Sequence, residues 1–142
     1  LTDHVMLGGY VTQEILDTKT GESAYAPLNN LATWIDIHTN GKKTEFGVFA
    51  GYTENLGAKD SISIADLPNK TRGYNIHNIF RVSPRIVFIS GKLRIATELE
   101  YTAAAYATTA KNGTININYK GVVTEHEYVN NTRLLLSFIY SF

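Results

Sequence analysis

Apolar and polar residues alternate with a period of two along most of the chain, which is the pattern of β-strands with two unlike faces. Six alternating segments are long enough to cross a membrane at a tilt, which takes roughly 9 to 11 residues. They cover residues 4–16, 29–39, 43–56, 75–90, 92–107 and 127–142. Helical periodicity is weak throughout. The pattern predicts an all-β, antiparallel fold over residues 1–142, with no separate second domain.

The two faces of these segments differ in charge. In the last segment one face is uniformly apolar and consists of Leu134, Leu136, Phe138, Tyr140 and Phe142. In the other segments the charged residues share the opposite face, while segment 4–16 leaves its register open. The charged set is Asp36, Glu45, Arg81, Arg85, Arg94, Glu98, Glu100 and Arg133. Such strands suit a barrel wall with one face toward lipid and one toward water.

Short and long connections alternate along the chain. Asn40-Gly41 and Ser90-Gly91-Lys92 are tight-turn signals, whereas 17–28, 57–74 and 108–126 are longer polar stretches. Outer-membrane barrels alternate short periplasmic turns with longer extracellular loops. If the last strand ends in the periplasm, both short turns fall there and all three long connections lie outside.

Six strands are fewer than the roughly eight of the smallest common barrels, so we expect them to belong to a larger up-and-down barrel whose other strands precede residue 1. An alternative adds strands at 61–65 and 114–123 to give a small eight-stranded barrel, but the alternation of connections opposes it. Pro84 lacks a backbone donor, which predicts a bulge, an edge or an interrupted ladder in its strand.

Composition removes several functional classes. The chain has 13 basic and 13 acidic residues, so no net charge attracts nucleic acid or an anionic substrate. It has no cysteine, which excludes disulfides, thiol catalysis and Cys-ligated zinc. No apolar stretch approaches the ~20 residues of a membrane-spanning helix, although β-barrel strands escape this test.

No catalytic or cofactor motif is visible. The histidines His4, His38, His77 and His126 are scattered, and no H-E-x-x-H spacing occurs. The run Glu125-His126-Glu127 is more typical of a solvated loop than of a metal site. Neither Ser83 nor Ser90 lies in a G-x-S-x-G elbow. We therefore expect no enzyme, no metal and no cofactor.

The ending Arg133-Leu-Leu-Leu-Ser-Phe-Ile-Tyr-Ser-Phe142 resembles the terminal strand of Gram-negative outer-membrane proteins. That resemblance implies an outer-membrane location and a signal for the barrel assembly machinery at Leu136, Phe138, Tyr140 and Phe142. The runs 81–94 and 98–106 are similar to the closing hairpin of large porin-like proteins of the Bacteroidota. This second resemblance implies a larger parent barrel, with a homotrimer as one form of it.

The leading functional hypothesis is a porin-like channel for passive diffusion of small hydrophilic solutes, lined by the eight charged residues given above. In a narrow or plugged barrel the same charges would only pair across strands. Tyr10, Tyr52, Tyr101, Tyr106, Tyr128, Tyr140 and Phe142 are candidates for aromatic girdles at the lipid head groups. Two alternatives stay open: a soluble antiparallel β-domain that binds a ligand or partner, and a non-conducting structural barrel.

Overall fold

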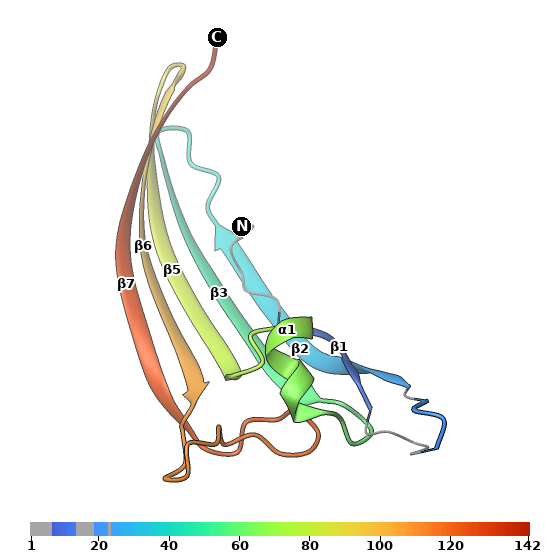
Figure 1. Ribbon diagram of the computed structural model, residues 1–142. Helices are drawn as coiled ribbons and strands as arrows, with labels where there is room; N and C mark the ends of the chain where they lie inside the picture. Colours follow the sequence, from blue (N-terminus) through green and yellow to red (C-terminus); the bar gives the residue numbers. More distant parts are fainter. Residues whose placement is uncertain (1–6, 14–18, 23) are drawn as a thin grey trace.

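The computed structural model describes residues 7–13, 19–22 and 24–142, and in this part of the chain the strands form one antiparallel sheet. The sheet order is β4-β1-β2-β3-β5-β6-β7, and the sheet curls into half of a barrel (Figure 1). The strands are β1 (Gly8–Thr12), β2 (Tyr25–His38), β3 (Thr44–Gly57), β4 (Thr71–Arg72), β5 (Ile76–Ser90), β6 (Leu93–Ala107) and β7 (His126–Tyr140). The predicted all-β antiparallel fold is confirmed.

The strands follow the alternating segments closely. Those predicted at 43–56, 75–90, 92–107 and 127–142 agree with β3, β5, β6 and β7 to within two residues at each end. The prediction of 29–39 was too short, because β2 begins at Tyr25 and pairs with β1 over its first four residues. Segment 4–16 is described only in part, where it forms β1 and a bridge at Gln13.

Short and long connections lie at opposite ends of the sheet, as the sequence predicted. The turns between β2 and β3 and between β5 and β6 lie at the upper end in Figure 1, and the long connections lie at the lower end. Gly91 has a φ of 58°, so the second turn uses a left-handed backbone conformation that glycine adopts without strain.

The described residues 61–65 and 114–123 form no strand, so the alternative of two additional strands there is wrong. Residues Ile64–Asp66 form a 3-10 turn and Leu67–Lys70 form the short helix α1, with Pro68 in its first turn. Residues 109–123 make only isolated bridges, such as Ile117 with Val123. Leu67, the first residue of α1, is fully buried.

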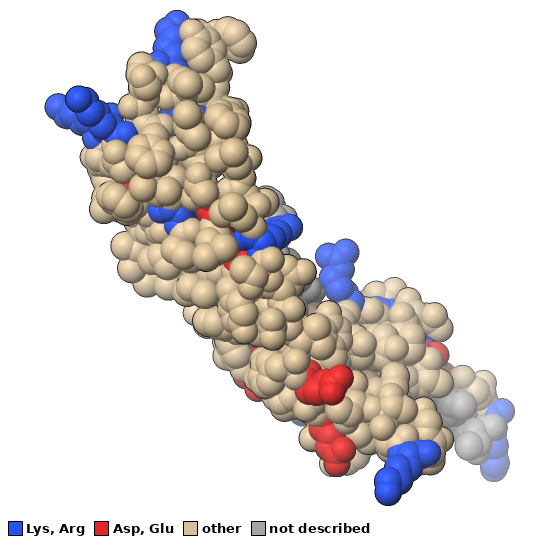
Figure 2. All heavy atoms as spheres, turned by 90° about the vertical axis from the view of Figure 1, so that its left-hand side faces the viewer, with Lys and Arg blue, Asp and Glu red and all other residues tan. Residues whose placement is uncertain are grey.

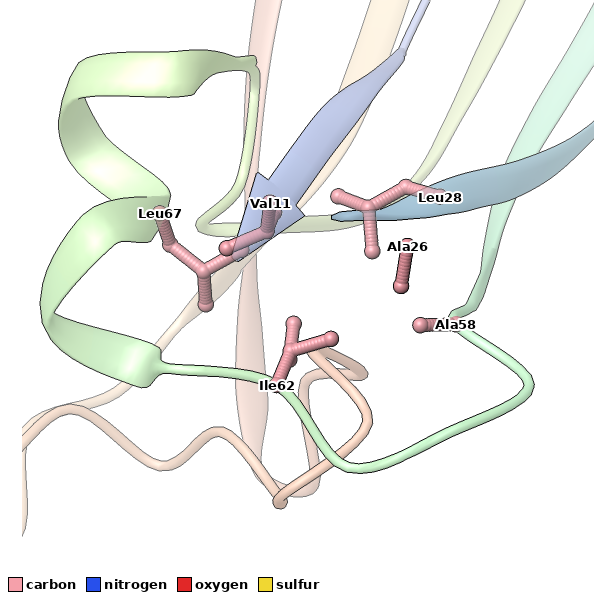
Figure 3. Packing of buried hydrophobic residues seen from close by; sticks show 6 residues of the cluster. All are labelled: Val11, Ala26, Leu28, Ala58, Ile62 and Leu67. Carbon is pink, nitrogen blue, oxygen red and sulfur yellow. The ribbon is translucent and has the colours of Figure 1, made fainter. Parts of the chain in front are cut away.

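A small hydrophobic core lies between α1 and the sheet. It is formed by the six residues whose side chains point toward one another in Figure 3: Val11, Ala26, Leu28, Ala58, Ile62 and Leu67. Two backbone hydrogen bonds, Ala58 N to Lys120 O (2.8 Å) and Ile62 N to Tyr119 O (2.9 Å), join the two long connections to each other. These connections form a cap on the end of the sheet.

The cap lies inside the curl of the sheet (Figure 1), which identifies the concave face as the one that carries Ala26 and Leu28. The expectation that this whole face is polar and open to water is therefore wrong at the long-connection end. There the alternate positions hold Ala26, Leu28, Ile79 and Ala104, and all four are buried. The eight charged residues named above lie along the remaining length of this face.

Pro84 interrupts a ladder without shifting it. The β5–β6 pairing runs through Val82↔Tyr101 and resumes at Arg85↔Glu98 in the same register, with Ser83 and Pro84 outside it. On the other side, Pro84 pairs with Val48 of β3 in an unbroken register. The missing donor of proline thus falls on the β6 side, and the predicted interruption is confirmed.

No helix in the described part of the chain is long and apolar enough to cross a membrane.

Candidate functional site

All eight charged residues that the sequence singled out lie on the concave face. The register fixes this, because Asp36 is level with Phe49, and Phe49 is level with Ser83 between Arg81 and Arg85. Across the next ladders, Arg85 is level with Glu98, and Glu100 with Arg133. Successive side chains of a strand alternate between faces, so the whole set faces inward.

Asp36 and Arg85 form the most closely spaced ion pair. Arg85 Nη2 of β5 donates to Asp36 Oδ1 of β2 at 2.6 Å, although β3 lies between the two strands. The arginine crosses β3 over Gly47, where an added Cβ would be 2.8 Å from Arg85 Nε. Glycine at this position is what lets the two side chains meet.

A second ion pair also spans one strand, nearer the short turns. Arg94 Nη2 of β6 donates to Glu45 Oε2 of β3 at 2.7 Å, across β5. This pair borders a hollow of about 220 Å³ on the concave face. The hollow is lined by His38, Glu45, Phe46, Gly47, Arg85, Val87 and Arg94.

The third group joins two arginines to one carboxylate. Arg133 of β7 lies 2.9 Å from Glu100 through its Nε, and Arg81 of β5 lies 3.4 Å from Glu100 on the other side. Arg81 Nε also donates to Thr102 Oγ1 at 3.0 Å. A hollow of about 380 Å³ opens over these residues and Asn131. Two cations therefore share one buried carboxylate.

Glu98 differs from the other seven charged residues because it forms no ion pair in the described part of the chain. It is level with Arg85, but that guanidinium is bonded to Asp36. The negative charge of Glu98 lies two residues from Glu100 on the same face. The eight residues are four acids and four arginines, so this set is neutral in total although its ion pairing is uneven.

The structure adds three residues that sequence reasoning did not select. Gly47 provides the crossing point of Arg85, and Thr102 and Asn131 line the larger hollow. Small or polar residues at inward positions were the available signal. Trp34, two residues from Asp36 on the same face of β2, is level with Gly51 and largely exposed.

Two histidines that are far apart in sequence are stacked. The ring centroids of His77 and His126 are 4.9 Å apart, and His77 Nε2 lies 3.9 Å from Glu54 Oε1. In the described residues no group of three or more His, Cys, Asp or Glu side chains is arranged to hold a metal ion. His4 lies outside the described residues.

The convex face is apolar and exposed. Leu136, Phe138 and Tyr140 of the proposed assembly signal lie on it, and Phe142 follows the strand with its ring 5.6 Å from that of Tyr140. Tyr52 and Tyr128 also lie on this face, whereas Tyr106 has the inward parity of Glu98. Uncharged residues dominate this side in Figure 2, with charged atoms in separate groups along its length.

Both faces and one edge of β7 lack a covering element in the described part of the chain. β7 pairs only with β6, and every residue from His126 to Tyr140 is exposed. At the other edge of the sheet β1 is covered by β4. Unprotected long edges favour pairing with another strand.

Comparison of the chain with family models, with curated proteins and with solved structures finds no match in any of the three.

Proposed function

We propose that this chain forms part of the wall of an outer-membrane β-barrel that acts as a channel for passive diffusion of small hydrophilic solutes. One observation carries the proposal: over most of the length of the strands, charged side chains lie on one face of the sheet alone. The convex positions within 31–37, 46–52, 80–88, 93–103 and 130–140 hold no charged side chain, and Glu54, which has convex parity, lies near the long connections. The concave face holds the eight charged residues named above. A wall between lipid and water requires this arrangement.

The exposed apolar surface favours a membrane protein over a soluble domain. Large side chains such as Leu134, Leu136 and Phe138 are 70%, 61% and 65% exposed, and they continue across β6, β5 and β3. Monomeric soluble proteins rarely expose contiguous apolar patches beyond a few hundred Å². A soluble domain of this fold would need another layer over its convex face.

The half-barrel shape supports a larger assembly. A closed pore needs about eight strands or more, and the long unpaired edge of β7 provides a place where a further strand would pair. We propose a larger barrel, of which a homotrimer is one form, inserted by the barrel assembly machinery through Leu136, Phe138, Tyr140 and Phe142.

The charged concave face would line the pore of that barrel. The proposed lining is Asp36, Glu45, Arg81, Arg85, Arg94, Glu98, Glu100 and Arg133. Ion pairing does not remove this role, because charges held in place at a water-filled wall still create a field that acts on passing solutes. The ion pairs hold the charged side chains in place. Because the pairing differs along the face, the electric field at the wall has a direction.

Bilayer conductance of the purified native assembly tests the proposal. We expect stepwise conductance, and we expect Arg133→Gln to move the reversal potential in a salt gradient toward cation selectivity. Lys59→Gln makes the same charge change on an exposed connection and serves as the control. A protein that remains monomeric without detergent contradicts the proposal, and one that inserts without conducting supports the structural barrel instead.

A further inference from the structure

Three lysines lie together at the short-turn end of the sheet. Lys42 and Lys43 belong to the turn between β2 and β3, and Lys92 belongs to the turn between β5 and β6. All three are exposed, and none forms an ion pair with an acidic residue in the described part of the chain. We call this set the lysine rim.

Backbone hydrogen bonds hold both turns beside neighbouring strands. Ile89 N of β5 donates to Lys43 O at 2.8 Å, and Ser141 N, just after β7, donates to Lys92 O at 3.0 Å. The lysine backbones are therefore fixed at one end of the sheet, while their long side chains keep their freedom to reach outward. The positions of the rim lysines are thus fixed by the two short turns and their neighbouring strands, and not by a long loop.

The rim makes the two ends of the sheet electrically different. Near it, Glu45 is already paired with Arg94 at 2.7 Å, so the three lysines remain uncompensated. At the opposite end acids and bases are mixed, for example Asp66 with Lys70 at 3.1 Å. Figure 2 shows blue atoms at the upper end and both red and blue atoms at the lower end.

Apolar side chains of the convex face continue up to the rim. Phe46 and Leu93 closely follow Lys43 and Lys92 in sequence. Phe88 is level with Thr44, the residue after Lys43, and Tyr140 is level with Leu93. Phe46, Phe88 and Tyr140 are exposed. Aromatic rings favour the depth of lipid head groups, and nearby lysines extend their ammonium groups toward phosphates.

From this arrangement we propose that the lysine rim binds anionic phospholipid head groups, and so sets which end of the wall meets an anionic membrane surface. The inference rests on the proposed function, because it needs the convex face to contact lipid. Lysine suits this ligand, since its ammonium is a compact point charge that pairs with phosphate without a fixed geometry. A nucleic acid or an acidic protein would leave the adjoining aromatic face uncovered.

The test compares binding of the full chain to vesicles of phosphatidylcholine alone and of phosphatidylcholine with about 30% phosphatidylglycerol. Each lysine near an anionic surface contributes roughly a fivefold gain in partitioning. We expect tighter binding to the anionic vesicles by at least about tenfold at low salt, and loss of this preference near 1 M salt, where the Debye length falls to about 3 Å.

Two triple variants separate local charge from total charge. Lys42→Gln, Lys43→Gln and Lys92→Gln together should abolish the preference for anionic vesicles. The matched triple Lys59→Gln, Lys111→Gln and Lys120→Gln removes the same charge from the long connections and should keep it. Circular dichroism of vesicle-bound protein verifies that both retain the sheet, and the salt series on the unmodified chain tests the proposal if either does not.

The outcomes distinguish this inference from the proposed function. Equal binding to both vesicles overturns the lipid inference while leaving the membrane wall intact. Equal losses in the two triple variants also overturn it, since total charge would then explain the effect. Failure to bind either kind of vesicle overturns the proposed function as well.

Discussion

At the scale of single residues, the charged concave face depends on small side chains as much as on charged ones. Arg85 reaches Asp36 across an intervening strand only because position 47 has no Cβ. The sequence marked Asp36 and Arg85 as members of one face, since their parity reveals that much. Their contact was not predictable, because nothing in the sequence says which strands are neighbours or which position between them is empty.

We predict that Gly47→Ala weakens the Asp36–Arg85 pair. The added carbon would lie 2.8 Å from Arg85 Nε and 3.1 Å from its Cγ, so the arginine must move away. Losing a charged hydrogen bond of this kind costs about 1–2 kcal/mol in the free energy of unfolding. Denaturant unfolding measures the loss, and in an Asp36→Asn background the same substitution should cost much less. Additive costs of the two substitutions would contradict the steric explanation.

A second residue-scale prediction concerns Asp66, which lies in the cap. A hydrogen bond with Thr12 and one from Lys70 lower the pKa of its carboxyl below the ordinary value. A carboxyl with a depressed folded-state pKa stabilises the cap above its unfolded-state pKa, and this contribution is lost as pH falls through the folded-state pKa. We therefore expect the cap to loosen below about pH 4.

Pepsin cleavage within 57–75 at a series of acidic pH values measures that loosening. Asp66→Asn should abolish the part of the pH dependence of cleavage that comes from this carboxyl. At about pH 5 the variant should already be cleaved as readily as the unmodified chain is cleaved at lower pH. A variant whose cleavage profile follows that of the unmodified chain at every pH would show that Asp66 does not hold the cap.

At the scale of elements, strands were predictable and the cap was not. A strand repeats its signal over many residues, as the alternate apolar positions of β7 from Leu134 to Tyr140 illustrate. The cap consists of Ile62, Leu67 and short backbone bridges separated by turns, so no periodic signal exists. Ala26 and Leu28 were assigned to a connection for the same reason: their partners lie far away in sequence. Because these contacts with the cap were not predicted, the apolar character of this end of the concave face was not predicted either.

The cap should open as one unit. Leu67 is fully buried, so Leu67→Ala is expected to cost about 2–5 kcal/mol. Because Ala58 and Ile62 are bonded to Lys120 and Tyr119, hydrogen exchange should accelerate in both long connections together, with the strands unaffected. Leu134→Ala, on the exposed convex face, is the control and should leave exchange of the cap unchanged. Faster exchange confined to 57–75 would show that the two connections are independent.

At the scale of the whole molecule, we expect the concave face to contact water and the convex face to contact lipid. Trp34 is the chain's only tryptophan, and it lies on the concave face. In vesicles its fluorescence should be quenched by iodide in the water and little affected by brominated lipid tails. Strong quenching by the lipid bromines, with protection from iodide, would reverse the assignment of the two faces.

Cysteine accessibility tests the central claim most directly, because the chain has no cysteine of its own. Ala96→Cys and Ser137→Cys are paired positions on the concave face, whereas Thr97→Cys and Thr132→Cys lie on the convex face of the same two strands. In vesicles, with a water-soluble maleimide, we predict rapid labelling of the first two and protection of the other two until detergent replaces the lipid. Equal labelling of all four in vesicles would contradict the proposal that this sheet is a wall between lipid and water.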